Sequence, residues 1–465
     1  MVRVPVNDRL NCPQVVVYFM LTSFVACGIA VVAGLLAAFS YTPYYGYLRA
    51  GGLTLQHLRP LHVTFAAAWI FCAATTIVYF YIHNHCVSPP VKSRRKPLWH
   101  LLFWWMAGIG VLTTLTAGSF SGREYLGFHP LFSFLFLVGW LLFAAIYFSC
   151  VGFSLRGQPV YIYMWSVGVI LFVITFLEGH LYLIEAVSNR PLRDIAIQWK
   201  SYGSLVGSFN LLVYGSLAYL SERISGSSKY AHSNTAFALF YLGVLNTFTN
   251  YGHHTYHLPQ SAWLHWLSFL VSMLEIVILL KLLLDIRGLF RHRHRQKSYP
   301  VTRLIVTCAT LWTFVLLILA ILISIPPVNT LIHGTHMVVA HSMGSMLGID
   351  SMILWAGCSL ILHSLLGDNH PVLAGKAVSS VIVLLNIFLL LFWSSFVAKG
   401  LFVGVTRYMG SSGPDFSLLE SEFPLVMVVS GAATALSILV LLFLWTRAIL
   451  RGAPGHRGWR ELRAL

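Results

Sequence analysis

Long apolar runs, separated by short polar loops, occupy most of the chain. Each run meets or exceeds the roughly 20 residues that a helix needs to cross a hydrocarbon core of about 30 Å. These runs predict spanning helices at residues 14–40, 58–82, 98–118, 129–151, 160–188, 201–221, 234–252, 262–286, 301–326, 330–364, 376–398 and 423–449. We therefore expect an all-α integral membrane protein with twelve transmembrane helices in a single polytopic domain, residues 1–465.

Composition supports a membrane protein, because 57% of the residues are hydrophobic and only 9% are charged. The first apolar run is too long for a cleavable signal and lacks a small-residue cleavage site. The seven cysteines are scattered singly, mostly in or beside apolar runs, where a free thiol behaves as a small hydrophobe. The chain contains no CxxC or CxxCH motif, so it carries no covalently attached c-type haem.

The basic residues predict the orientation of the chain. With twelve spans both termini lie on one side, and most of the 30 Lys and Arg residues fall in loops on that side, for example at 92–96, 291–297 and 451–463. The positive-inside rule then places both termini in the cytoplasm, and we expect the cell inner (cytoplasmic) membrane. The net charge of +16 is spread over many short loops without a groove-reading motif. We expect the anionic lipid surface as its partner and no nucleic acid.

Histidines inside the apolar runs are the first candidates for chemistry, because an imidazole in the membrane is costly unless it is paired or ligated. Several fall at a similar depth near the outer surface: His62, His180, His253, His254, His333, His336 and His341. Convergence from different helices is what a buried metal or haem cluster requires. Unrelated histidines that cap helices at the interface are the alternative.

Two of these segments have informative spacing. His253 and His254 close the seventh run, where two adjacent side chains can turn toward one metal as the helix unwinds. His341 and Met343 are two residues apart, about 200° around a helix, so each can address a different flat cofactor. Ordinary apolar packing remains the alternative for Met343. We also expect His336, in the same run, to bind a cofactor.

Intramembrane carboxylates are few: Glu178, Glu185, Glu275 and Asp350. Such residues usually pair, stay protonated, bind metal or relay protons. We expect Glu275 and Glu178 to be catalytic, with Glu275 the best candidate for feeding or tuning an active site, and Asp350 is expected to pair with a buried partner.

Together these motifs resemble the large subunit of the nitric oxide reductases, within the haem-copper oxidase superfamily. The resemblance spans nearly the whole chain and rests on twelve spans and on RPLH at 59–62, GREYLGFHP at 122–130, GHH at 252–254, SMLE at 272–275 and HGTHMVVAHSMG at 333–344. It implies a bundle like subunit I of the haem-copper oxidases, with a low-spin haem b, a high-spin haem b and a non-haem iron or copper.

The resemblance also implies roles for single residues. His62 matches a ligand of the low-spin haem, His341 the proximal ligand of the high-spin haem, and His253 with His254 two ligands of the non-haem metal. Glu275 matches a glutamate near that metal. Glu124 lies in the segment that approaches a calcium ion between haem propionates.

The sequence departs from the family pattern at three places. Met343 replaces the second histidine ligand of the low-spin haem, and a thioether typically raises the haem potential relative to imidazole. Gly203 and Gly207 occupy the sixth-helix positions where the family has a histidine and a glutamate near the non-haem metal. We therefore expect His180 to supply the missing ligand, with Glu178 or Glu185 nearby in sequence and His257 in reserve.

The expected function is reduction of nitric oxide to nitrous oxide by an oxidoreductase of the respiratory chain. The tyrosine of the oxygen-reducing members is absent at the matching positions, Thr247 and Gly207, which favours nitric oxide as the gas substrate. Without an outer N-terminal extension, the expected donor is a cytochrome c-type subunit or a soluble cytochrome c. The alternatives are reduction of oxygen or of another nitrogen oxide, and a haem-based gas sensor or electron-transfer subunit without turnover. A secondary transporter would not explain the histidines at a common depth.

Overall fold

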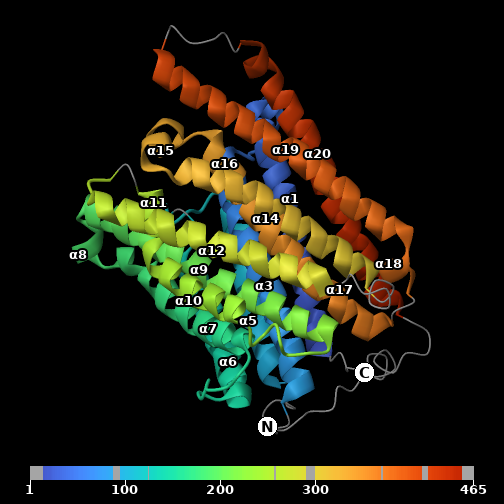
Figure 1. Cartoon of the computed structure of the whole chain (residues 1–465). Coiled ribbons are helices and arrows are strands. Elements are labelled where there is room, and N and C mark those ends of the chain that lie inside the picture. Colours follow the sequence, from blue (N-terminus) through green and yellow to red (C-terminus); the bar gives the residue numbers. More distant parts are fainter. Residues whose placement is uncertain are drawn as a thin grey trace.

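The computed structural model describes residues 14–86, 95–123, 125–255, 258–289, 299–367, 370–410 and 417–452, without the side chains of 253, 289 and 417–420. The part of the chain so described is helical and contains no strand (Figure 1). Its elements are α1 (Gln14–Ala38), η1 (Phe39–Tyr41), α2 (Tyr45–Ala50), α3 (Leu55–His85), α5 (Arg95–Thr116), α6 (Pro130–Val151), α7 (Val160–Glu178), η2 (Leu181–Leu183), α8 (Glu185–Ser188), α9 (Pro191–Ser225), α10 (Asn234–Thr249), α11 (Tyr251–His254), α12 (Ala262–Leu289), α14 (Pro300–Ser324), α15 (Pro326–Ile332), α16 (His336–Met343), η3 (Gly344–Ser351, a π-helix), α17 (Met352–Leu366), α18 (Pro371–Ala374), α19 (Lys376–Met409) and α20 (Ser417–Arg451).

The long helices cross the molecule in one bundle, and the short helices α8, α11 and α15 lie at one end of it (Figure 1). Eleven spans within the described ranges are long and apolar enough to cross a membrane. The remaining predicted span, 234–252, corresponds to α10, which has only 16 residues and is continued by α11. α10 packs against α7, α9 and α12, so it belongs to the bundle. The all-α membrane fold is confirmed, and its helix count agrees closely with the prediction.

Local sequence explains where several spans begin and end. α6 begins at Pro130, and the preceding His129 accepts the backbone N–H of Leu131, which satisfies a free donor of the first turn. α9 likewise begins at Pro191 and ends before Gly226, which has φ 63 and closes the helix in the left-handed region.

Burial separates a central group of helices from a peripheral one. In the apolar stretches of α3, α9 and the continuous span from His336 to Leu366, 78%, 83% and 83% of the residues are buried. In α5, α6, α12 and α19 the share is between 28% and 33%, as expected for helices with one side toward lipid. The central helices carry His62 on α3 and both His341 and Met343 on α16.

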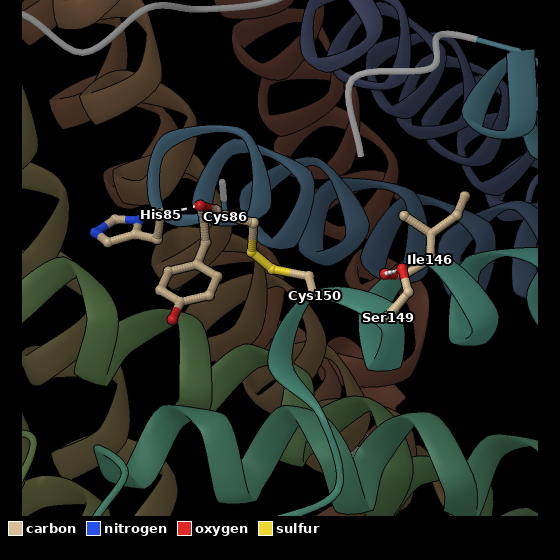
Figure 2. The surroundings of a disulfide bond; sticks show 6 residues. His85, Cys86, Ile146, Ser149 and Cys150 are labelled. Carbon is tan, nitrogen blue, oxygen red and sulfur yellow. Dashed lines mark hydrogen bonds between the residues drawn. A yellow bond between two sulfur atoms is a disulfide. The ribbon is translucent and has the colours of Figure 1, made fainter. Parts of the chain in front are cut away.

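One pair of cysteines corrects the expectation of isolated thiols. Cys86, directly after α3, and Cys150, near the end of α6, form a disulfide with their Cα atoms 5.7 Å apart, a normal disulfide separation (Figure 2). The two residues are 64 positions apart in sequence, so spacing alone could not pair them. Cys27, Cys72 and Cys308 are buried free thiols, as is Cys358.

Candidate functional site

The imidazole of His62 is fixed between α3 and α1. Its Nδ1 lies 2.8 Å from the carbonyl oxygen of Ala30, so Nδ1–H donates to that carbonyl. The Nε2 of His62 forms no hydrogen bond within the described structure and is available to a ligand. Gly34 makes this placement possible, because a Cβ there would lie 2.5 Å from Nδ1. A backbone acceptor on one nitrogen and a free second nitrogen is the usual arrangement of a metal-ligating histidine.

The span that carries His341 and Met343 changes its helix type directly after them. α16 ends at Met343, and the next eight residues form the π-helix η3, which is rare and frequent at functional sites. Two glycines of η3 let it lie directly against α14, since a Cβ at Gly344 would be 2.7 Å from Leu316 and one at Gly348 would be 2.6 Å from Trp312.

One ring nitrogen of His341 has no hydrogen-bond partner in the described part of the chain. This nitrogen, Nδ1, is buried. Met343 is half-buried and packs against the apolar core, so ordinary packing and haem ligation both fit its position. His336, at the start of α16, is enclosed by aromatic rings, with Phe396 stacked at 5.9 Å and Tyr41 at 5.5 Å, and its buried Nε2 has no hydrogen-bond partner in the described chain.

The structure brings the end of the seventh predicted span toward α16. His254 interacts electrostatically with both His341 and His333, which come from a segment about eighty residues later in the chain. Trp199 of α9 stacks on the His254 ring with centroids 6.0 Å apart and planes 9° apart, which holds the ring in place. The side chain of His253 lies outside the described residues. His254 and His341 are thus near enough to interact electrostatically, and their convergence on one metal or haem site stays a prediction.

Gly203 and Gly207 of α9, the positions at which we expected metal ligands to be missing, lie against the end of α10 and the residue that follows it. A Cβ at Gly203 would lie 2.4 Å from Oδ1 of Asn250, and one at Gly207 would lie 2.3 Å from Oγ1 of Thr247. The Nδ2 of Asn250 donates to the carbonyl of Gly203 at 2.9 Å, and Ser204 donates to the carbonyl of Thr247 at 2.7 Å. A larger side chain at Gly207 would push α9 and α10 apart, whereas one at Gly203 would have to displace the side chain of Asn250.

His180, the predicted replacement ligand, is hydrogen-bonded to Ser133 of α6. It follows α7, and its Nδ1 bonds to the carbonyl of Phe176 while its Nε2 bonds to Oγ of Ser133 on α6, each at 2.7 Å. Both ring nitrogens are therefore engaged within the protein. Glu178, at the end of α7, forms an ion pair with Lys200 of α9. The ligand role of His180 and the catalytic role of Glu178 remain predictions, and these contacts give each side chain a structural partner.

Glu275 lies at the centre of a buried polar group. The Nδ2 of Asn246 on α10 donates to Glu275 Oε2 at 2.5 Å, and Ser272 donates to Oδ1 of the same asparagine at 2.7 Å. Asp350 of η3 and Tyr214 of α9 interact electrostatically with Glu275. Sequence reasoning missed this association, although two carboxyls near the middle of two spans were a usable signal.

Two further predicted residues, Glu124 and His257, lie outside the described residues. Next to Glu124, Arg123 forms an ion pair with Asp194 at 2.6 Å and lies over the Tyr182 ring at 4.2 Å. These contacts anchor the GREYLGFHP segment to the beginning of α9.

The described side chains fit a haem better than they fit a non-haem metal. His62 and His341 each have an imidazole nitrogen that no protein group occupies, on two of the most buried spans. By contrast, no three side chains of His, Cys, Asp or Glu among those described are grouped so as to hold a metal ion. Of the two adjacent histidines predicted to bind the non-haem metal, the structure describes the side chain of His254 and not that of His253.

Comparisons with known proteins identify the family and the fold. The family model of Cytochrome C and Quinol oxidase polypeptide I matches residues 14–436. A cryo-EM structure of a heme-copper terminal oxidase dimer has the same fold, with a TM-score of 0.68 and 13% sequence identity over 94% of this chain and 84% of that one. None of the curated proteins compared matches the sequence. The chain belongs to the family of Cytochrome C and Quinol oxidase polypeptide I, and it is a redox-active, multi-pass membrane subunit of the heme-copper oxidase type.

Proposed function

We propose that this chain reduces nitric oxide to nitrous oxide and water, with electrons from a cytochrome c. The observation that carries the choice of substrate is the contact between Gly207 and Thr247, because these are the positions at which the oxygen-reducing members are expected to carry a tyrosine. Thr247 is fully buried and its hydroxyl donates to the carbonyl of Gly243 at 2.8 Å. No phenol is available at either position.

In this proposal the protein residues bind, orient and supply protons. His62 and Met343 would hold a low-spin haem b, and His341 would hold a high-spin haem b. When bound, these haems supply electron transfer and a site for a diatomic gas. Trp199 holds His254 toward the same region. Glu275 lies close enough to Asn246 to keep its carboxyl oriented while it exchanges a proton.

The membrane arrangement is part of the proposal. Both termini are placed in the cytoplasm, because the basic loops would then face the anionic inner leaflet. The gas substrate can reach the buried site through the lipid, and the electron donor would bind at the outer face.

Two other functions are favoured by particular observations. The structural neighbour is described as a heme-copper terminal oxidase, which favours oxygen reduction. The close packing of Gly203 and Gly207 against α10 favours a haem protein that senses a gas or transfers electrons without turnover, because it removes two expected ligand positions.

Gas consumption by the purified, reduced chain separates these three functions. Nitric oxide loss and nitrous oxide formation would be followed with reduced cytochrome c as donor, and oxygen loss would be followed in parallel. We expect nitrous oxide formation that His341→Ala abolishes and that His232→Ala, a change at an exposed loop histidine, leaves intact. Oxygen consumption without nitrous oxide would establish the oxidase function. Binding of gas without consumption would establish the sensor or electron-transfer function.

A further inference from the structure

Asp350 is a buried carboxyl that no protein group holds. It is 0% exposed, and neither of its side-chain oxygens has a hydrogen-bond partner among the described residues. None of the ion pairs in the described structure includes it. The next residue, Ser351, does have partners, since it accepts from Trp69 Nε1 at 2.8 Å and donates to the carbonyl of Met346 at 2.7 Å. From the sequence we expected Asp350 to pair with a buried partner, but no described residue forms a hydrogen bond with its carboxyl.

The helix around Asp350 is built to keep the carboxyl inside. Asp350 belongs to the π-helix η3, whose wider turn shifts the following side chains relative to those of α16. The glycines of η3 bring the segment against α14, so no lipid reaches it from that side. The neighbours Ile349 and Met352 are also buried.

Asp350 lies deep in a membrane span, where an unpaired charge is costly. The span that contains Asp350 runs from His336 to Leu366, so Asp350 lies near its middle. Glu275 likewise lies near the middle of α12, which runs from Ala262 to Leu289. An ionised carboxylate at this depth without a cation is strongly disfavoured, so an isolated acid there is neutral and carries a proton.

Two other groups share this region with Asp350. Glu275 and Tyr214 both interact with it electrostatically, from α12 and α9 respectively. Oε2 of Glu275 accepts a hydrogen bond from Asn246. Its Oε1 lies near Gly243 of α10, 3.4 Å from the place that a Cβ on that glycine would take. Two acids, one phenol and one amide from four different elements therefore share one buried region, in which Asn246 and Glu275 are hydrogen-bonded.

We propose that Asp350 is a proton-carrying acid that acts with Glu275 to supply the protons of the reduction. This inference rests on the proposed function, because 2 NO + 2 e⁻ + 2 H⁺ → N₂O + H₂O consumes two protons, and reduction of oxygen to water also consumes protons. In each cycle Asp350 releases its proton and takes up another, so that it returns to the neutral acid. No hydrogen bond joins Asp350 to Glu275, so proton transfer between them requires movement of a side chain or water between the two acids.

Infrared difference spectroscopy tests this role directly, since it detects protonated carboxyls and needs no substrate. The full-length, haem-containing chain would be produced with aspartate labelled with 13C at the side-chain carboxyl, and reduced-minus-oxidised spectra would be recorded. We expect one isotope-sensitive C=O band that changes on reduction and disappears in Asp350→Asn. An aspartate band that does not respond to reduction, or a responsive band that persists in Asp350→Asn, would overturn the proposal.

Turnover provides the second measurement. Asp350→Asn keeps the size of the side chain but cannot carry a proton, and we expect it to lower turnover about a hundredfold or more. Asp350→Glu should restore most of it, and Asp285→Asn, at an exposed residue paired with Lys281, should leave it unchanged. Wild-type turnover in Asp350→Asn would refute the role. If the chain reduced neither gas, the proposed function would fail while the infrared band would still decide whether Asp350 exchanges a proton. If Asp350→Asn does not fold, Asp350→Glu makes the same assignment, because the glutamate carries no label and the isotope-sensitive band should disappear.

Discussion

The contact between Gly34 and His62 gives the sharpest prediction about haem binding. In Gly34→Ala, the added Cβ would lie 2.5 Å from Nδ1 and 2.8 Å from Cε1 of His62. Because an ordinary contact between such atoms is about 3.5 Å, the ring has to move by about 1 Å. The ring is the mobile end of its side chain, so it moves away and the packing of α1 on α3 is kept.

The cost of this movement falls on the placement of the imidazole. Its Nδ1–H bond to Ala30 lengthens from 2.8 Å beyond hydrogen-bonding distance, which costs about 1 kcal/mol. Residual crowding adds about 1–3 kcal/mol, while alanine in place of glycine in a helix returns about 1 kcal/mol. The net cost of about 1–3 kcal/mol corresponds to haem retention weakened by roughly 5- to 150-fold.

The assay is the content and spectrum of low-spin haem per polypeptide in the purified variant. Gly28→Ala is a matched control on the same helix, since its Cβ would be 3.9 Å from the nearest atom, Leu439 Cδ2. We expect the control to keep its low-spin haem and Gly34→Ala to lose it or to show an altered spectrum, with similar thermal unfolding in both. Identical haem spectra in the two variants would refute the placement of His62 as a haem ligand.

Three further predictions concern other parts of the structure. Met343→His should lower the potential of the low-spin haem, and an unchanged potentiometric titration would show that Met343 is only packing. His180→Ala and Ser133→Ala should lose similar stability, because the two side chains share a hydrogen bond; metal loss in His180→Ala alone would support the ligand assignment, and unchanged metal content in both would refute it. Cys86→Ser should lower the free energy of unfolding by about 2–4 kcal/mol, and reduction of the Cys86–Cys150 disulfide in the wild type should have the same effect; equal stability of the oxidised and reduced chains would contradict this.

The spans were predictable from the sequence because the bilayer imposes their length and apolar character. Their ends were less predictable. The predicted span 201–221 is part of a helix from Pro191 to Ser225, whose first turns are polar. Those turns are stabilised by ion pairs to distant residues, Asp194 with Arg123 and Lys200 with Glu178, and hydropathy does not detect such pairs.

The predicted tenth span shows the same limit. The run 330–364 reads as one apolar segment, but the chain breaks at Gly334, where φ is 72, and the spanning helix begins at His336. Its π-helical part depends on the contacts of Gly344 and Gly348 with α14, and those contacts are tertiary.

The candidate site was predictable as residue types but not as an arrangement. Adjacent histidines and mid-span acids are visible in the sequence. The pairing of Glu275 with Asn246 and the contact of Gly207 with Thr247 depend on how helices pack, as does the partner of His180. Without the structure, a glycine at a ligand position reads as a missing ligand, whereas here it is also the point at which two helices touch.

The most direct test of the account is the measurement of haem b and non-haem metal per polypeptide in the purified chain, by pyridine haemochrome and elemental analysis on one sample. The account predicts low-spin and high-spin haem b together with iron or copper beyond that of the haems. Haems without a second metal would contradict nitric oxide reduction at a paired metal site and would favour a sensor or an electron-transfer subunit.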